Sequence, residues 1–365
     1  SPARLPPHGL PEIRLDHLAR LTDDTGILQH ATYDVPNRGE GYCTDDNARA
    51  LTLLVRLEAL GCDSAETRRL TSTYAAFVGH AFTPDTGRFR NFLGWDRRWL
   101  DERGSDDCLG RAIVALAACI GRSRNTRLQH WAVPMVVPAL RAAVDTSSPR
   151  CWALAAIGLR DYLRRLGGDL LAVRLQQTFI GRLVDLQRAN AATGWPWIED
   201  VVAYENARVC EALVSSGDER AIAVGLEMLT WLTSLQRSDS GRFTPIGCRG
   251  FFRRGGRPAV FDQQPIEAEA TIAACLAAFE ATRESQWLDL AWNAFDWFQG
   301  HNILGTALAD PHTGGCRDGL MPDRTNENRG AESTLAYLSS LAAMKQVTVL
   351  GGSRRPSWRS RPAPA

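Results

Sequence analysis

Apolar residues recur at three- and four-residue spacing through almost the whole chain, and this is the period of helices that bury one side or more. No run of alternating apolar and polar residues predicts a regular strand. Thr44, Ser105, Ser148 and Gln264 each stand directly before an expected first turn, as N-terminal capping residues do. The pattern predicts twelve helices, which begin near Pro11, Asp45, Ser64, Asp106, Thr126, Pro149, Asp169, Tyr204, Asp218, Pro265, Ser285 and Gly330.

The connections between these helices alternate in length. A few residues around Gly61, Gly217 or Glu284 join the two helices of a pair, whereas the segments that lead into the next pair are long and polar. Loops of that length inside a compact domain usually carry function. We therefore expect six helical hairpins with long loops gathered at one end, formed by residues 22–44, 82–105, 191–203, 238–264 and 301–329.

Helices that follow a long loop are the more apolar ones and are rich in small residues, as in GRAIVALAACIG and EATIAACLAAFEA. Helices such as 64–81 and 285–300 have a charged face and are expected outside. This division predicts an all-α fold of two concentric rings, the (α/α)6 toroid, over residues 1–350. The alternative is an open superhelix of repeats, which the lack of a fixed repeat length disfavours. Residues 351–365 are rich in Pro, Ser and Arg and predict a disordered tail.

Carboxylates stand in the first turns of five of the six expected inner helices. TDDNARAL at 44–51 is echoed by SDDCLGRAI at 105–113 and by YENARVCEAL at 204–213. Acidic residues are favoured at helix starts in any case, because they oppose the helix dipole. In a closed toroid, however, all inner first turns meet in one funnel, where carboxylates drive one another's pKa values apart and can supply an acid and a base. The predicted catalytic residues are Asp46, Asp107, Glu205, Glu269 and Glu332.

The long loops and the helix starts also supply groups that suit a carbohydrate. Aromatic rings stack on sugar faces, and neighbouring polar side chains bond the hydroxyls. The alternative is that the tryptophans only hold the loops against the rim of the barrel. The predicted substrate-binding residues are His30, Tyr42, Asp45, Arg49, Arg88, Asn91, Trp95, Trp99, Asp106, Trp195, Trp197, Tyr204 and Gln264.

Composition excludes several other chemistries. The 365 residues hold 42 Lys+Arg against 41 Asp+Glu, and Lys345 is the one lysine, so Schiff-base and P-loop mechanisms have no suitable residue. A net charge of +1 favours neither nucleic acid nor a membrane surface as partner. The nine cysteines form no CxxC pair, which predicts reduced thiols in a cytoplasmic protein and no metal site. No dinucleotide, metalloprotease or esterase motif is present, so we expect no cofactor.

The helix starts and one loop carry a resemblance to a known group of proteins. With GAES opening the last helix, the pattern resembles the six-hairpin glycosidase superfamily. The segment DDTGILQHATYDVPNRGEGYCTDDNARAL resembles bacterial glycosidase-like domains that occur beside, or fused behind, glycosyltransferases. The resemblance implies a saccharide in the funnel and a possible glycosyltransferase partner. In the unsaturated glucuronyl hydrolases of that superfamily two aspartates at successive inner helices carry the chemistry, and Asp46 and Asp107 fall at comparable places.

Three functions remain open at this point. The first is an inverting glycoside hydrolase that acts on an oligo- or polysaccharide through two carboxylates. The second is a non-catalytic saccharide-binding domain that serves a glycosyltransferase. The third is an isoprenoid cyclase, for which Asp23-Asp24 and Asp45-Asp46 supply only fragments of the usual aspartate motifs.

Overall fold

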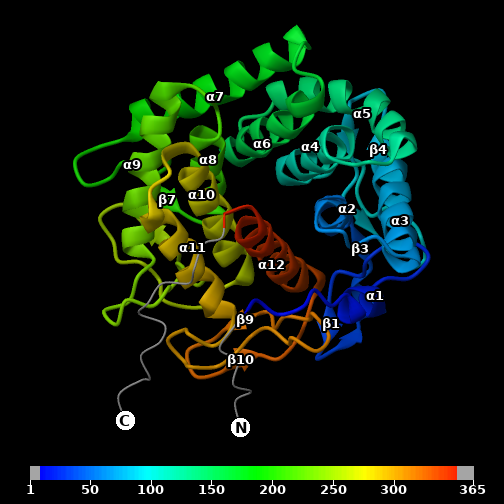
Figure 1. Cartoon of the computed structure of the whole chain (residues 1–365). Helices are drawn as coiled ribbons and strands as arrows, with labels where there is room; N and C mark the ends of the chain where they lie inside the picture. Colours follow the sequence, from blue (N-terminus) through cyan, green and yellow to red (C-terminus); the bar gives the residue numbers. More distant parts are fainter. Residues whose placement is uncertain (1–8, 352–365) are drawn as a thin grey trace.

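The computed structural model describes residues 9–351 and contains twelve α-helices arranged in two concentric rings (Figure 1). The predicted all-α (α/α)6 toroid is confirmed. The inner ring consists of α2 (Thr44–Ala59), α4 (Asp106–Gly121), α6 (Pro149–Arg165), α8 (Asn206–Val214), α10 (Pro265–Thr282) and α12 (Ala331–Gly351). The outer ring consists of α1 (Asp16–Leu21), α3 (Ala65–Ala81), α5 (Thr126–Val144), α7 (Leu170–Asn190), α9 (Glu219–Leu235) and α11 (Ser285–Phe298).

The inner ring is closed by its own neighbours. Each inner helix packs against the next, and α12 packs against α2, which joins the two ends of the chain. The short α1 lies against α12 and completes the sixth hairpin as its outer helix. An open superhelix would leave α2 and α12 apart, so the contact between them rules out that alternative.

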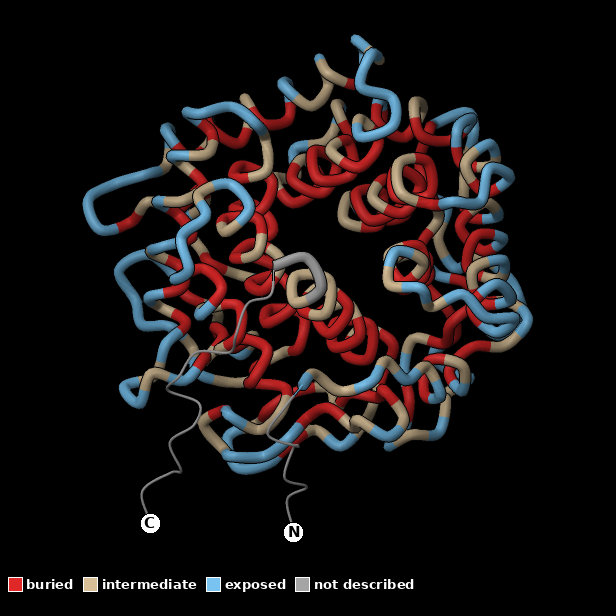
Figure 2. Tube along the Cα trace, in the orientation of Figure 1, coloured by how far each residue is buried: buried red, intermediate tan, exposed pale blue. Residues whose placement is uncertain are grey.

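Burial follows the two rings, with buried residues mainly inside and exposed residues on the outer surface (Figure 2). Small residues allow the inner helices to approach closely. A Cβ atom at Gly110 of α4 would lie 2.9 Å from a methyl carbon of Leu154 on α6, and one at Gly158 would meet Ile113 at 3.2 Å. The alanine- and glycine-rich sequences therefore determine which helices form the inner ring.

Most helix starts agree with the prediction, and a few differ. Ser105 and Ser148 cap α4 and α6 as expected. Thr44 is already helical, and the residue that caps α2 is Cys43, whose Sγ accepts a bond from the backbone N–H of Asp46 at 3.4 Å. The first helix begins at Asp16 rather than near Pro11, and the described residues before it have no regular secondary structure.

The long loops all lie at the end where the inner helices begin, and they contain ten two-residue strands that the apolar pattern did not predict. Strands this short leave no alternation to detect. One pair joins the first loop to the second, with Tyr42 opposite Leu93 and Cys43 opposite Phe92. The five antiparallel pairs are β1 (Ala31–Thr32) with β2 (Val35–Pro36), β3 (Tyr42–Cys43) with β6 (Phe92–Leu93), β4 (Phe82–Thr83) with β5 (Arg88–Phe89), β7 (Val201–Val202) with β8 (Phe252–Arg253), and β9 (Gly319–Leu320) with β10 (Thr325–Asn326).

Several further predictions concern the chain as a whole. All nine cysteines are free thiols, and seven of them are buried. In the described part of the chain, no helix is long and apolar enough to span a membrane, and no group of His, Cys, Asp and Glu could hold a metal ion. Residues 352–365, which include most of the predicted tail, lie outside the described range. The domain boundary at residue 350 and the cytoplasmic location stay predictions.

Candidate functional site

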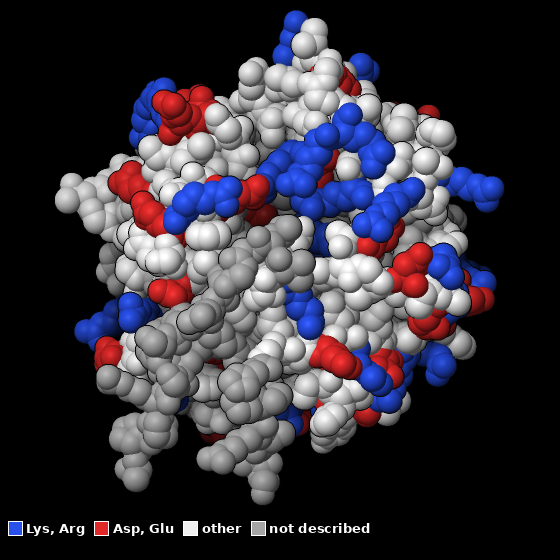
Figure 3. Space-filling model, viewed as in Figure 1, with Lys and Arg blue, Asp and Glu red and all other residues white. Residues whose placement is uncertain are grey.

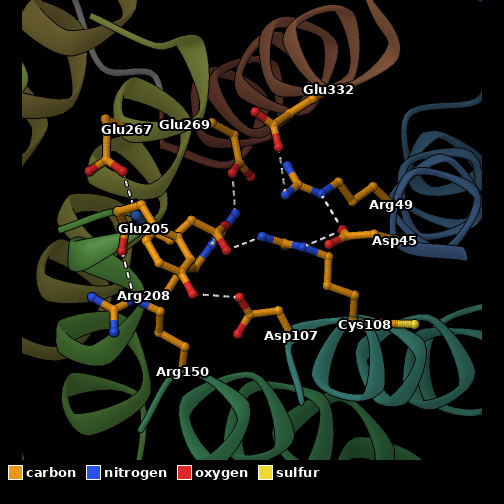
Figure 4. A network of polar contacts seen from close by, with 12 residues as sticks. Asp45, Arg49, Asp107, Cys108, Arg150, Glu205, Arg208, Glu267, Glu269 and Glu332 are labelled. Atoms are coloured by element: carbon orange, nitrogen blue, oxygen red, sulfur yellow. Dashed lines mark hydrogen bonds and ion pairs between the residues drawn. The ribbon is translucent and has the colours of Figure 1, made fainter. Parts of the chain in front are cut away.

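The first turns of the inner helices converge on one funnel, where carboxylates alternate with arginines (Figure 4). The acidic side chains come from α2, α4, α10, α12 and the residue before α8, as predicted. Helix α6 has no acid in its first turn and contributes Arg150 instead. The site is therefore a mixed ring of opposite charges rather than a cluster of acids.

Arg111 of α4 lies across the middle of this ring. Its Nε is 2.6 Å from Oδ1 of Asp45, and its Nη2 contacts the carboxylate of Glu205 on the far side. Arg49 extends the layer, because its Nε donates to Asp45 at 2.8 Å and its Nη2 donates to Glu332 at 3.2 Å. Side chains from α2, α4, α12 and the α8 start are thus joined in one layer of ion pairs (Figure 4).

Arg208 forms the second half of this layer. It donates to the carboxylate of Glu269 on α10 and, at 2.6 Å, to Glu211 on its own helix. Burial alone would raise the pKa of Glu205, but Arg111, Arg49 and Arg208 outweigh burial and lower that pKa to about 2. The expectation of unpaired, mutually repelling carboxylates was therefore wrong for Glu205 and Glu269. Each is bound to an arginine that stands on the inner face of α4 or α8.

The backbone around Glu205 is unusual. This residue has φ of 46° and ψ of 34°, a left-handed conformation that costs a non-glycine residue about 1–3 kcal/mol. Its N–H donates to Glu267, which also accepts a bond of 3.1 Å from Nδ2 of Asn206. Burial raises the pKa of Glu267 to about 7. Glu267 thus holds the start of α8 in position, and the conformation delivers the Glu205 carboxylate to the layer of arginines.

Asp107 has a different environment from the paired acids. It is partly exposed, it forms no ion pair with any residue that the structure describes, and its carboxylate accepts a 2.6 Å bond from the hydroxyl of Tyr204. Burial raises the pKa of Asp107, while the Tyr204 bond acts in the opposite direction. Arg150 holds Tyr204 by donating to its carbonyl at 2.7 Å and by stacking over its ring at 4.5 Å.

The two remaining predicted acids differ in exposure. Asp46 is 7% exposed and accepts a bond from the thiol of Cys43 at 3.1 Å. Burial raises its pKa to about 7. The Glu332 side chain keeps 43% of its surface accessible within the funnel, and its pKa is raised because the surrounding walls exclude bulk water, although Arg49 opposes the effect.

Several predicted substrate-binding residues do stand around the funnel. Asp45, Arg49 and Tyr204 line the ring itself. Asp106 is paired with Arg88 at 2.6 Å. The side chain of Asn91 caps α2 by accepting from the N–H of Asp45 at 3.2 Å, so Arg88 and Asn91 are occupied with local structure.

Farther out, the loops place some of the predicted groups at the rim. Trp95 is 57% exposed, with the Arg38 guanidinium 5.9 Å from its ring centre. His30 is exposed, and Gln264 is half-buried where α10 begins. Trp99 is half-buried against Phe77 and His80. Trp95 and His30 are therefore the predicted loop groups most open to a ligand.

Three predicted ligand-stacking rings belong to the core instead. Trp195 and Trp197 are 4% and 0% exposed and pack against Trp231, so they hold the 191–203 loop to the barrel. Tyr42 is 1% exposed and donates its hydroxyl to Asp23. These three rings have no open face on which a sugar could stack, and the prediction that they bind substrate was wrong.

The residues that sequence reasoning missed are mainly the arginines of the layer. Arg111, Arg208 and Arg150 were not predicted at the site, although a signal for two of them was present. Arg49, Arg111 and Arg208 each follow a first-turn acid by three or four residues, which places acid and base on the same helix face. The role of Arg150 has no such signal, since its helix lacks the acid.

Comparison with known proteins supports the fold. No family model matches the chain, and no curated protein matches its sequence. Among solved structures, a cellobiose 2-epimerase from Bacillus thermoamylovorans B4167 superimposes with a TM-score of 0.70 at 11% identity, covering 91% of this chain and 96% of the other. The chain has the (α/α)6 toroid fold of this enzyme.

Two further structures share it. A GH76 alpha-mannanase from Bacteroides thetaiotaomicron matches with a TM-score of 0.61 at 11% identity, over 91% of this chain and 95% of the other. A cellulase of C. cellulolyticium in complex with cellobiose matches with a TM-score of 0.58 at 10% identity, over 88% of each chain. Identities this low establish the architecture and leave the reaction to be argued from the site.

Proposed function

We propose that the protein is an inverting glycoside hydrolase that acts on an oligo- or polysaccharide, with Asp107 as the general acid and Glu332 as the general base. One observation carries the proposal. Among the described first-turn carboxylates, Asp107 alone combines freedom from ion pairs with access to the funnel. Burial raises the pKa of this carboxyl, which favours its protonated form, and its exposure lets it reach a ligand.

The proposed reaction follows from these positions. Asp107 protonates the glycosidic oxygen as the bond to the anomeric carbon breaks, and Glu332 removes a proton from the water that attacks the opposite face. The two residues start α4 and α12, which lie on either side of α2, so a sugar and a water fit between them more readily than between adjacent residues (Figure 4). A raised pKa makes Glu332 the stronger proton acceptor while it is ionised.

The other predicted catalytic acids receive supporting roles in this proposal. Glu205 and Glu269 anchor Arg111 and Arg208 by ion pairs, so these two positive charges are held in the layer of ion pairs. The buried carboxyl of Asp46 accepts a hydrogen bond from the Cys43 thiol and has no direct part in the proposed reaction. The saccharide class is supported by the similar structures, which are described as epimerases, a cellulase and a mannanase that act on sugars.

The second candidate function is a non-catalytic saccharide-binding domain that partners a glycosyltransferase. It is favoured by the ion pairs themselves, because four of the funnel's carboxylates are neutralised by arginines and are poorly placed to transfer protons. In that case the funnel and the exposed Trp95 would bind an oligosaccharide without cleaving it.

The experiment that separates these functions is a panel of oligosaccharides incubated with the wild type, Asp107→Asn, Glu332→Gln and, as a matched control, Asp289→Asn on the exposed side of α11. The first two variants should each lower kcat about 100- to 10,000-fold, and the control should leave it unchanged. Proton NMR should detect the inverted anomer as the first product. Full activity in the Asp107→Asn/Glu332→Gln double variant, a retained anomer or an epimerised product would contradict the proposal, and tight binding without cleavage would support the second function.

A further inference from the structure

A cavity of about 50 Å³ lies within the inner ring beneath the layer of ion pairs. Its polar lining consists of the guanidinium groups of four arginines and a few small or acidic side chains, and apolar residues of α4, α6 and α12 form the remainder. The polar residues of this luminal cavity are Arg49, Arg56, Arg111, Arg208, Thr52, Glu269 and Ser339.

The cavity extends away from the proposed catalytic groups. Arg49 and Arg56 both belong to α2, and seven residues of helix separate them by about 10 Å along the axis. Arg49 takes part in the layer of ion pairs, whereas Arg56 stands in the last turn, near the end of the toroid opposite the funnel. Arg111 belongs to the same layer as Arg49, since it pairs with Asp45 and Glu205.

Arg56 is the cation of this cavity that lacks a counter-charge. Among the described residues it has neither a hydrogen bond nor an ion pair, although it is only half-exposed. The nearest acids are already engaged, since Asp161 accepts from Arg122 at 2.5 Å and Glu211 accepts from Arg208 at 2.6 Å. Burial and the charge of Arg122 both lower the pKa of Arg56. A bound anion would relieve this unfavourable environment.

The face at that end of the toroid is also basic. The inner helices finish there, and the space-filling view of that face has arginines gathered around its upper part (Figure 3). Those near the ends of α4 and α6 are Arg122, Arg124, Arg164 and Arg165. Cations are stabilised at helix C-termini in general, and this effect explains the arginines on that face. It does not explain why the unpaired Arg56 lies inside the lumen.

We propose that the luminal cavity binds a phosphate-type oxyanion at Arg56, as a site separate from the saccharide funnel. Arg56 approaches from α2, Arg111 from α4 and Arg208 from α8, so positive charge surrounds the cavity from three helices. Arg111 and Arg208 are already paired with carboxylates, which leaves Arg56 as the main donor to an anion. A tetrahedral anion with several oxygens accepts bonds from such divergent directions, whereas a planar carboxylate is best met by one guanidinium. The phosphate is either free or carried by a phosphorylated sugar.

The test measures binding of inorganic phosphate to the full chain by titration calorimetry, at constant ionic strength set with sodium chloride. Arg56→Gln should weaken phosphate binding at least about tenfold. Arg141→Gln, which removes an exposed arginine from the outer helix α5, should leave it unchanged. Arg56→Lys should retain part of the affinity because it keeps the charge. No saturable phosphate binding by the wild type, or equal binding by wild type and Arg56→Gln, would overturn the proposal.

Two further titrations identify the source of the phosphate. If a hexose 6-phosphate binds more tightly than inorganic phosphate and Arg56→Gln weakens both, the ligand is a phosphorylated sugar. If inorganic phosphate binds as tightly or more tightly and shows the same dependence on Arg56, the ligand is the free ion. Glucose alone should not compete in either case, and competition by glucose would overturn a site built on charge. Because binding is measured without turnover, failure here is distinguishable from failure of the proposed hydrolase.

Discussion

The ion pair between Arg111 and Glu205 stabilises the folded protein, and the pKa of Glu205 gives the size of its contribution to the free energy of unfolding. Glu205 is 2% exposed, and three arginines lower its pKa from an ordinary 4.5 to about 2. At about 1.4 kcal/mol per pKa unit, this difference corresponds to about 3 kcal/mol of folding free energy at neutral pH. Arg111 has the largest effect among the three arginines, so we expect Arg111→Gln to lose more than half of it, about 2–3 kcal/mol.

The loss should depend on pH in a defined direction. A carboxylate whose pKa is lower in the folded state stabilises the fold above its unfolded pKa, and this contribution disappears as pH falls through the folded pKa. The wild type should therefore exceed Arg111→Gln in free energy of unfolding by the full amount at pH 7. The difference should begin to shrink below about pH 4.5 and vanish near pH 2.

Urea unfolding followed by tryptophan fluorescence measures these differences for the wild type, Arg111→Gln, Glu205→Gln and the double variant. The Glu205→Gln change keeps the shape of the side chain and leaves Arg111 with Asp45, so it should cost less than Arg111→Gln. The double variant should be more stable than the sum of the two single losses predicts, by about 1–3 kcal/mol. Additive losses, or a cost of Arg111→Gln that stays constant down to pH 3, would refute the reasoning.

Three other predictions follow from the same geometry. Tyr204→Phe removes the hydrogen bond that lowers the pKa of Asp107, so the alkaline limb of the kcat/KM profile should move to higher pH if Asp107 must be protonated; a shift to lower pH would contradict this assignment. Trp197→Ala should destabilise the fold by about 3–5 kcal/mol in thermal unfolding while leaving saccharide affinity of the folded protein unchanged, because the ring is fully buried. Trp95→Ala should alter stability by less than about 0.5 kcal/mol yet weaken oligosaccharide binding about tenfold in a titration, and unchanged affinity would remove Trp95 from the binding surface.

Much of the architecture was available from local patterns. The three- to four-residue period identifies the twelve helices, and the alternation of short and long connections places all long loops at one end of the toroid. The small-residue sequences of α4 and α10 mark them as inner helices, since only such helices can be surrounded on every side. The short strands escaped prediction because two residues contain no measurable alternation.

Fewer features of the candidate site than of the fold could be predicted, because contacts between distant parts of the chain decide which side chains are exposed. The positions of the first-turn acids follow from chain-local signals, so Asp46, Asp107 and Glu332 could be named in advance. Exposure of a tryptophan depends on what packs against it from elsewhere in the chain. Trp197 and Trp95 both lie in long loops, yet Trp231 packs against the first, whereas the second keeps 57% of its surface exposed beside Arg38.

The sequence by itself determined the period of the helices, the order of the hairpins and the placement of acids at the starts of the inner helices, because these depend on residues close together in the chain. Which charges meet was decided only by closure of the ring, which brings Arg111 to Glu205 and Arg49 to Glu332 across 94 and 283 residues. Coulombic attraction and burial depend on distance in space, so the pKa values that separate Glu205 from Asp107 belong to the tertiary structure.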